Sequence, residues 1–340
     1  MVREWDPRAA SAGEIEAFVE TINATLTADL PDDPPWECAH LREYLSETMP
    51  GERRIAWIVE GDPAVPGRRR PILGHANILL LGDIGVVELL VHPAARRSGL
   101  GRALLGTVAR RAYKERFASL GVEVVGGTPA VPFFEAMGFN QEYVETRSVL
   151  QLSTVDWGAL GEMARGISAG YRIEFFPGGP PDGLLNAYAR AKAELRDTED
   201  AELDLHPSSY DPQRLRESLD CLHRRGMKPY IVLAIHERSG EVAGLTEVVV
   251  PAQHPRRADQ YDTIVAQRHR GYGIDRAIKA RMLFELRCAE PKVAEVQTWN
   301  AQSNESMLKV NAELGFLPDR DWLEYGRDVA ELVCELDGSR

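Results

Sequence analysis

Two short segments combine arginine and glycine where a helix is expected to begin. Residues 96–101 read RRSGLG, and residues 270–275 read RGYGID. The first amides of a helix have no internal acceptor, and the helix dipole places partial positive charge at that end. Glycine lets the backbone turn sharply and approach a ligand closely. With arginines beside them, these turns predict sites for a phosphate-bearing ligand; the alternative is an ordinary strand-to-helix turn with solvated arginines.

Two common nucleotide-binding patterns do not fit these turns. A P-loop requires G-x-x-x-x-G-K-[ST], which the sequence lacks. A dinucleotide fold places its glycine turn after the first strand, with an acidic residue about 20 positions later. Here each turn follows a later strand of its half, and a helix ending in Gly-Phe comes some 40 residues after it, at 138–139 and 315–316.

The elements that must position these turns alternate between strand and helix in both halves. In the first half, we expect helices over 12–26, 102–117 and 129–138, and strands over 54–60, 72–81, 85–91, 122–125 and 146–152. In the second half, we expect helices over 184–195, 214–224, 274–287 and 304–314, and strands over 171–176, 230–236, 242–250, 261–265 and 293–299. This order predicts an α/β fold with partly parallel pairing.

The two halves repeat one pattern. The arginines that open the turns are 174 residues apart (270 − 96), and the Gly-Phe pairs are 177 apart (315 − 138). Glu88 stands eight residues before Arg96, and Asp262 stands eight before Arg270. A repeat of this length indicates two copies of one domain. We therefore expect domains over 1–155 and 156–340.

Composition limits the classes of function. The 340 residues include 40 Lys+Arg and 52 Asp+Glu, a formal charge of −12, which argues against nucleic acid and anionic membranes as partners. The four cysteines form no C-x-x-C pair, so neither a zinc site nor a disulfide framework is expected. The N-terminal segment carries charges where a secretory signal needs an apolar core, and no run approaches about 18 apolar residues. We expect a soluble, cytoplasmic protein without a metal.

At these motifs the sequence resembles the GNAT superfamily of acyl-CoA-dependent N-acyltransferases. The matching pieces are VVELLVHP with RRSGLG and FFEAMGF in the first half, and DTIVAQRHRGYGIDRAIK with NESMLKVNAELGF in the second. The resemblance covers both halves. It implies two tandem domains, each a mixed, mostly antiparallel sheet with a splayed centre flanked by helices, and acetyl-CoA as the cosubstrate.

The resemblance also implies which residues bind the cosubstrate. In the first half, the diphosphate would lie on the turn, which Arg96 opens and which continues through Arg97, Ser98, Gly99, Leu100, Gly101 and Arg102. A β-bulge at Leu90 and Val91 would admit the pantetheine arm, and a backbone N–H there would polarise the thioester carbonyl. The second-half counterparts are Val265, Arg270, Gly271 and Gly273, with Asn300 and Asn304 placed for a pantetheine amide. The alternative for Asn304 is helix capping.

A general base would remove a proton from the attacking amine. The resemblance makes Glu88 the candidate in the first half and Asp262 the candidate in the second. Because strand side chains alternate, Glu88 faces the same way as Leu90 and His92. The alternative is that both carboxylates are merely solvated.

Both halves depart from the family pattern. A tyrosine often stands four residues before the Gly-Phe glycine, where it protonates the thiolate; here those positions hold Phe134 and Asn311. In the second half Asp275 also replaces a small residue of the turn, and its charge would weaken phosphate binding. We therefore favour the first half as the acetyl-CoA site, with a catalytic second half or a non-catalytic acyl-CoA-binding protein as alternatives.

The acceptor is expected to be a small-molecule primary amine. The segments TADLPDDPPWECAH and DTEDAELDLHPSSYD are acidic and each contains an aromatic residue. They could hold a cationic amine; the alternative is that they are solvated loops. The alternative acceptor is a protein lysine or N-terminus, which the sequence cannot distinguish from a small molecule. The sequence also leaves open the identity of the amine, the acyl group and any oligomer.

Overall fold

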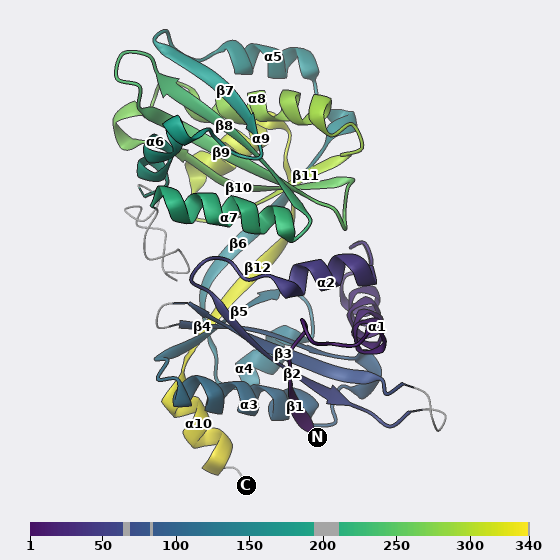
Figure 1. Ribbon diagram of the computed structural model, residues 1–340. Coiled ribbons are helices and arrows are strands. Elements are labelled where there is room, and N and C mark those ends of the chain that lie inside the picture. Colours follow the sequence, from purple (N-terminus) through teal and green to yellow (C-terminus); the bar gives the residue numbers. More distant parts are fainter. Residues whose placement is uncertain (64–68, 82–83, 194–210, 339–340) are drawn as a thin grey trace. The chain divides into compact units, whose positions relative to one another are not determined.

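The computed structural model describes residues 1–340 except 64–68, 82–83, 194–210 and 339–340 (Figure 1). It forms two compact units. Unit 1 comprises Met1–Val144 and Trp322–Arg340, and unit 2 comprises Glu145–Asp321. The expected acidic segment 197–211 of the second half falls almost wholly outside the described residues. Among the described helices, none is both long and apolar enough to span a bilayer.

Unit 1 contains an open sheet in the strand order β1-β2-β3-β4-β5-β12. Its elements are β1 (Val2–Trp5), α1 (Ala12–Asp29), α2 (Cys38–Ser46), β2 (Arg53–Glu60), β3 (Ile72–Leu81), β4 (Ile84–Val91), η1 (Pro93–Ala95), α3 (Leu100–Lys114), β5 (Ser119–Val125), α4 (Ala130–Ala136), the start of β6 (Asn140–Gln151), most of β12 (Leu317–Asp328) and α10 (Val329–Gly338). The α1 helix starts at a capping box, in which Ser11 and Glu14 bond each other's backbone amides.

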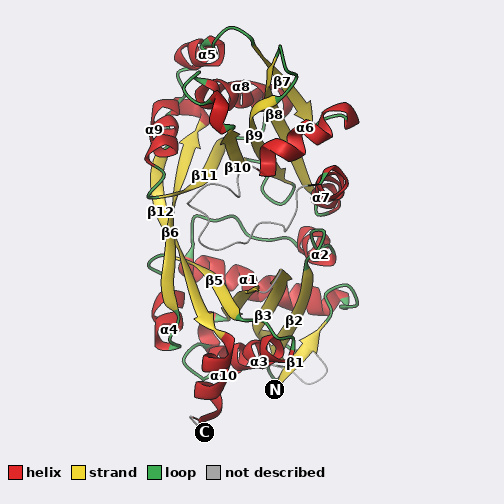
Figure 2. Cartoon of the chain, turned by 90° about the vertical axis from the view of Figure 1, so that its left-hand side faces the viewer, coloured by secondary structure: helices red, strands yellow, loops and turns green. Residues whose placement is uncertain are grey.

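Helices cover both faces of the unit 1 sheet (Figures 1 and 2). The α1 and α2 helices pack on one face, where Phe18 and Leu41 join Ile58 in a buried cluster. The α3 helix packs on the other face through the expected periodic residues Leu104 and Val108, both fully buried. Alternating side chains of each strand therefore serve two different cores.

Strands β4 and β5 pair for only a short distance. Their parallel pairing runs from Ile84 with Ser119 to Val86 with Gly121, and beyond it the two strands diverge. The pairing of β4 with β3 on its other side is unbroken from Ile84 to Val91. The splayed centre is present. The prediction of a β-bulge at Leu90 and Val91 is wrong, because β4 keeps a regular register with β3 and separates only from β5.

Unit 2 has the strand order β6-β11-β10-β9-β8-β7. Its elements are the rest of β6, η2 (Leu152–Thr154), α5 (Trp157–Arg165), β7 (Tyr171–Pro177), α6 (Asp182–Ala193), α7 (Pro212–Arg224), β8 (Met227–His236), β9 (Val242–Pro251), β10 (Arg257–Val265), η3 (Gln267–His269), α8 (Ile274–Ala289), β11 (Glu295–Ala301), α9 (Glu305–Leu314) and the start of β12. One core lies under α8 and a second under α6 and α7, on opposite faces (Figure 2).

The centre of unit 2 is splayed in the same way. Strands β10 and β11 pair in parallel only from Arg257 with Glu295 to Gln260 with Thr298. Here the strand before the turn does carry an irregularity, since the register with β9 shifts between Gln260 and Thr263. The expected bulge is therefore found in the second copy of the domain and not in the first.

The last strand of each half pairs within the other half's unit. Residues Glu145–Gln151 of β6 pair with β11 in unit 2. Residues Trp322–Asp328 of β12 pair with β5 in unit 1. The strand expected to close the first half thus completes the second sheet, and the compact units differ from the division at 155/156 that the sequence suggested.

Candidate functional site

The arginine-glycine turn of unit 1 leads directly into α3. Gly99 occupies the N-cap position with φ 87°, and Arg97 also has a positive φ of 62°. A left-handed conformation is inexpensive for glycine and rare for other residues. Local bonds fix the approach to this turn, because His92 Nδ1 accepts from the Ala94 amide at 3.2 Å and the Ser98 hydroxyl donates to the Ala95 carbonyl at 2.5 Å.

The backbone amides at this helix start have no protein acceptor within the described part of the chain. The first amide of the helix ladder to be bonded is that of Ala103, which donates to the Gly99 carbonyl at 3.0 Å. The unbonded amides belong to Arg97, Ser98, Gly99, Leu100, Gly101 and Arg102. Six donors in succession at the positive end of a helix form a site suited to an anion.

Arg96 holds the turn in place through contacts inside unit 1. Its Nη1 and Nη2 donate to the two carboxylate oxygens of Asp29 at 2.8 and 2.5 Å, and its Nε donates to the Val91 carbonyl at 3.2 Å. This bidentate pair ties the turn to the end of α1. The Arg96 side chain therefore positions the turn, while the backbone of the next residues offers the donors.

One backbone N–H of β4 faces the opening between β4 and β5. The His92 amide donates toward β3, to the Leu73 carbonyl at 2.9 Å. Because successive amides of a strand point to opposite sides, the Leu90 N–H also points toward β3 and the Val91 N–H points toward the opening. Of the two residues expected to lie at the opening, Val91 has the amide that can reach a ligand there.

Glu88 lies on the face of the sheet that α1 and α2 cover. It pairs across the strands with Asn77 of β3, whose side-chain amide donates to the Glu88 carboxylate at 2.6 Å. The Glu88 side chain is exposed, whereas Asn77 is fully buried. A carboxylate that is accessible and held by one neutral neighbour is able to accept a proton from a ligand.

The corresponding turn of unit 2 has the same backbone shape but a different donor set. Gly271 and Gly273 have φ values of 83° and 71°, and Gly273 is the N-cap of α8. Here, however, the Asp275 carboxylate accepts from the Arg276 amide at 2.9 Å. A negative side chain thus occupies one donor of the anion site. The turn also contacts the segment after α5, since the Ser168 amide donates to the Tyr272 carbonyl at 3.4 Å.

The second candidate base, Asp262, forms part of a buried ion cluster. Lys192 of α6 contacts the Asp262 carboxylate and lies 3.0 Å from both carboxylate oxygens of Glu247 on β9. The Tyr188 hydroxyl donates to the same Glu247. Burial alone would lower the pKa of Lys192, but the two carboxylates raise that pKa well above its ordinary value. Lys192 therefore stays charged and neutralises Asp262.

The ion cluster takes the place of the Asn77–Glu88 pair. Gly74 and Gly244 are equivalent, because Gly74 pairs with Val91 of β4 and Gly244 pairs with Val265 of β10. A Cβ on either glycine would also meet a carbonyl of that next strand. Counting three residues on from each glycine, Asn77 corresponds to Glu247. Sequence reasoning missed Lys192 and Glu247. The only signal was a tyrosine and a lysine four residues apart on the expected helix 184–195.

Comparison with known proteins agrees with this geometry. Residues 15–139 match the model of the Acetyltransferase (GNAT) family. A solved tandem GNAT protein from the clavulanic acid biosynthesis pathway superposes with a TM-score of 0.79 at 25% identity, covering 97% of this chain and 99% of its own. Residues 15–139 thus form a GNAT acetyltransferase domain, and the chain as a whole has the fold of a tandem GNAT protein.

Other relatives match over a smaller part of the chain or share the fold at lower identity. A mycothiol acetyltransferase from Stackebrandtia nassauensis is 28% identical over 200 residues, which are 58% of this chain and 61% of that protein. The Frankia alni protein of the same name is 25% identical over 71% of this chain and 67% of its own. The match thus spans about three fifths of the first relative's length. A GCN5-related N-acetyltransferase from Sphaerobacter thermophilus shares the fold, with a TM-score of 0.64 at 16% identity and 96% coverage of both chains.

The two asparagines expected to bind pantetheine in the second GNAT domain bond within unit 2. Asn304 is the N-cap of α9 and accepts from the Met307 amide at 3.1 Å, which was the alternative for this residue. Asn300 accepts from the buried Asn311 side chain at 2.6 Å. At the tyrosine position of the GNAT pattern, Phe134 lies in the core of unit 1 and Asn311 is committed to Asn300. Neither supplies an acid.

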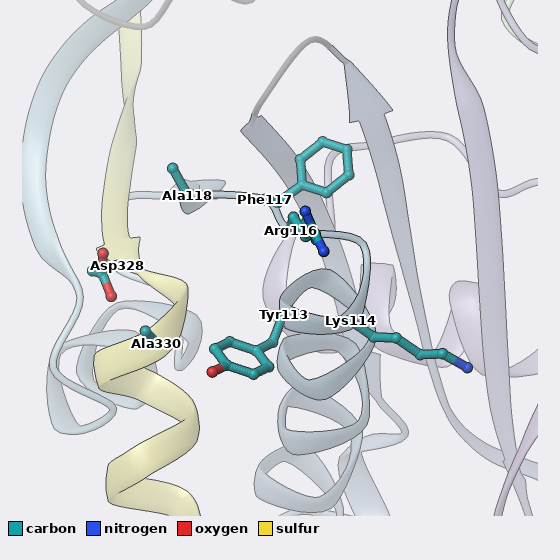
Figure 3. A pocket seen from close by; sticks show the side chains of 7 residues that line it. All are labelled: Tyr113, Lys114, Arg116, Phe117, Ala118, Asp328 and Ala330. Atoms are coloured by element: carbon teal, nitrogen blue, oxygen red, sulfur yellow. The ribbon is translucent and has the colours of Figure 1, made fainter.

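A surface hollow of about 620 Å³ lies elsewhere on unit 1, at the C-terminal end of α3 (Figure 3). It is lined by Tyr113, Lys114, Arg116, Phe117, Ala118, Asp328 and Ala330. None of the residues expected to bind acetyl-CoA lines it. The GNAT turn is at the opposite end of the same helix, so this hollow plays no part in the candidate site.

Proposed function

We propose that unit 1 binds acetyl-CoA in the cytoplasm and transfers its acetyl group to a primary amine. The observation that carries the proposal is the row of six unbonded amides from Arg97 to Arg102 at the start of α3. The GNAT family match lies in this unit, and the two curated relatives are acetyltransferases by name. Those relatives support the reaction class and leave the acceptor of this protein open.

The residues of unit 1 fit the groups that acetyl-CoA presents. The amides of the turn would hold the diphosphate, with the side chains of Arg97 and Arg102 adding charge. The divergence of β4 from β5 would admit the pantetheine arm. The Val91 N–H would donate to the thioester carbonyl oxygen, where negative charge develops. Acetyl-CoA supplies the acyl carbon, to which the amine nitrogen bonds as the carbon–sulfur bond breaks.

Glu88 would take the proton that the amine loses. Its carboxylate is exposed, and the side-chain amide of Asn77 fixes its orientation at 2.6 Å. Phe134 offers no proton to the departing sulfur. A thiol with an ordinary pKa of about 8.5 is a tolerable leaving group without one.

Two contacts favour unit 1 over unit 2. The Asp275 carboxylate bonds an amide of the second turn, and a carboxylate about 4 Å from a phosphate costs on the order of 1–4 kcal/mol. The second contact is the pairing of Asp262 with Lys192, which removes the free base that the reaction needs. Unit 2 therefore has an anion site with one amide blocked by a negative side chain and a candidate base that is neutralised.

The proposal is tested by paired substitutions of the two candidate bases in the full-length protein. Thiol release from acetyl-CoA is followed with a panel of primary amines. Glu88→Gln should lower the rate by about 100-fold or more while acetyl-CoA affinity stays within about twofold. Asp262→Asn should leave the rate unchanged. Loss of activity in Asp262→Asn alone would place the reaction in unit 2, and acetyl-CoA binding without transfer to any amine would indicate a non-catalytic binding protein.

A further inference from the structure

Four side chains under α1 and α2 of unit 1 have buried polar atoms without a hydrogen-bond partner among the described residues. The atoms are Trp5 Nε1, Arg54 Nε and Nη1, His75 Nε2 and Asn77 Oδ1. Trp5, His75 and Asn77 are at most 4% exposed. Buried polar atoms of native proteins almost always have a partner. Several orphaned atoms on one face therefore indicate that a polar ligand completes them.

Strand register places these side chains together. Trp5 pairs with Ala56, Ala56 with Asn77, and Asn77 with Glu88, so one row crosses β1, β2, β3 and β4. Arg54 and His75 each lie two residues from a member of that row, hence on the same face. Arg54 also contacts α2, its guanidinium lying 5.5 Å from the Tyr44 ring centre. Ala56, in the middle of the row, is buried in the cluster that contains Phe18.

Donors and acceptors are separated along this row. The orphaned Trp5 and Arg54 atoms are N–H donors, and they belong to β1 and β2. The acceptors, Asn77 Oδ1 and the Glu88 carboxylate, belong to β3 and β4. A primary ammonium carries only donors and a carboxylate only acceptors. The face is thus polarised to take an ammonium at one end and an anion at the other.

Two arginines of β1 and β2 lie on this face, Arg3, which is paired with Glu14 and Glu60, and Arg54. Burial, with the charge of Arg54 adding to it, lowers the pKa of His75 to about 3. His75 is therefore neutral and does not compete as an anion-binding group. Arg54 on β2 and Glu88 on β4 are separated by two inter-strand spacings across the sheet and by two residues along the strand. This corresponds to about 12 Å between their Cα atoms. That separation sets the span over which the ammonium and the carboxylate of a ligand would lie.

We propose that the acceptor of unit 1 is an amine that also carries a carboxylate, which Arg54 binds while Glu88 and Asn77 hold the amine. This inference rests on the proposed function, because it assigns the acceptor side of the same site. A guanidinium suits a carboxylate, since its planar fork can donate two parallel bonds. An amine without the carboxylate would leave the Arg54 donors unpaired and bind more weakly.

The test compares amines that differ only in the carboxylate. Thiol release from acetyl-CoA is measured for 4-aminobutyrate against propylamine, 5-aminopentanoate against butylamine, and alanine against ethylamine. Thermal shift with the same compounds gives a second readout. In the wild type, at least one carboxylated member should exceed its partner by about 10-fold or more in kcat/KM. Arg54→Gln should lower the kcat/KM of the carboxylated amine by about 10- to 100-fold. It should change the kcat/KM of the partner amine by no more than about threefold.

Arg53→Gln is the matched control. Arg53 is the neighbouring residue on β2, faces the other side of the sheet and pairs with Glu115 at 2.7 Å. It should keep the preference for the carboxylated amine. The inference would be overturned if amines with and without a carboxylate gave equal thiol release and equal thermal shifts. It would also be overturned if Arg54→Gln lowered kcat/KM equally for both classes of amine. Calorimetry separates the two proposals: intact acetyl-CoA binding without carboxylate preference refutes the acceptor class alone, whereas absent acetyl-CoA binding refutes the proposed function.

Discussion

Lys279 is a buried residue at which the two copies of the domain differ. Counting six residues on from the N-cap glycines Gly99 and Gly273, it occupies the place that Leu105 holds in α3. It is 2% exposed, and its ammonium lies 3.9 Å from the Met307 sulfur and 5.5 Å from the Phe316 ring centre. Burial lowers its pKa to about 7, with Asp275 acting in the opposite direction.

Replacing this lysine with methionine should stabilise unit 2. Below pH 7 both the folded and the unfolded chain bind the Lys279 proton, and above about pH 10.4 neither does. Between these values the unfolded chain binds more protons, so wild-type stability rises with pH. Lys279→Met removes this dependence and should raise the free energy of unfolding at pH 7 by on the order of 3 kcal/mol.

Urea unfolding at pH 7 and pH 9.5 checks this expectation. The gain from Lys279→Met should shrink at the higher pH, whereas the exposed Lys309→Met on α9 should change little at either. A methionine variant less stable than the wild type at pH 7 would contradict it.

At the same scale, the sequence could indicate which residues occupy the turns but not what their side chains contact. Glu88 and Asp262 have the same spacing to their arginines, yet only Asp262 meets a lysine. Lys192 is 70 residues away in the chain, and nothing in the local pattern of either residue signals that contact. Asn304 is different, because helix capping depends only on neighbouring residues and was foreseen as its alternative.

Among the elements, α10 and the end of β12 belong to unit 1 although they end the chain. Val329, Leu332 and Leu336 of α10 are buried in the cluster that contains Leu104 and Leu105 of α3. The Arg110 side chain of α3 also pairs with Asp337 at 2.8 Å. The helix that follows the RRSGLG turn is therefore supported by residues more than 200 positions later.

A cavity in α10 should loosen α3. Leu332→Ala removes a side chain that is 1% exposed and should cost about 2–5 kcal/mol of unfolding free energy. Hydrogen exchange should rise in α3 and β5, and acetyl-CoA affinity should fall with it. The exposed Cys334→Ala on the same helix should change neither. Faster exchange confined to α8 and β11 would show instead that α10 supports unit 2.

The position of β6 and β12 could not be read from the sequence. A strand is predicted over 146–152 and is present, up to Gln151, as part of β6, whereas no strand is predicted over the residues of β12. The pattern does not encode the partner, because any edge strand with a matching apolar face could accept either one. The turns, by contrast, follow from glycine and helix chemistry within six residues, and both are found where they were expected.

Over the whole molecule, two copies of one GNAT domain differ in the part that meets an anion. In unit 1, among the residues that the structure describes, the amides from Arg97 to Arg102 have no acceptor and the Glu88 carboxylate is bonded by the neutral Asn77 side chain. In unit 2, Asp275 places a carboxylate at the turn, and Lys192 pairs with the carboxylates of Asp262 and Glu247. These differences predict one acetyl-CoA per chain, bound by unit 1.

Titration calorimetry of acetyl-CoA with Gly99→Val and Gly273→Val tests this central claim most directly. Both glycines are left-handed N-caps, so a branched side chain strains each backbone by a similar amount, about 1–2 kcal/mol. Gly99→Val should weaken acetyl-CoA binding by about 10-fold or more, and Gly273→Val should bind one equivalent as the wild type does. Loss of binding in Gly273→Val with normal binding in Gly99→Val would contradict the assignment to unit 1.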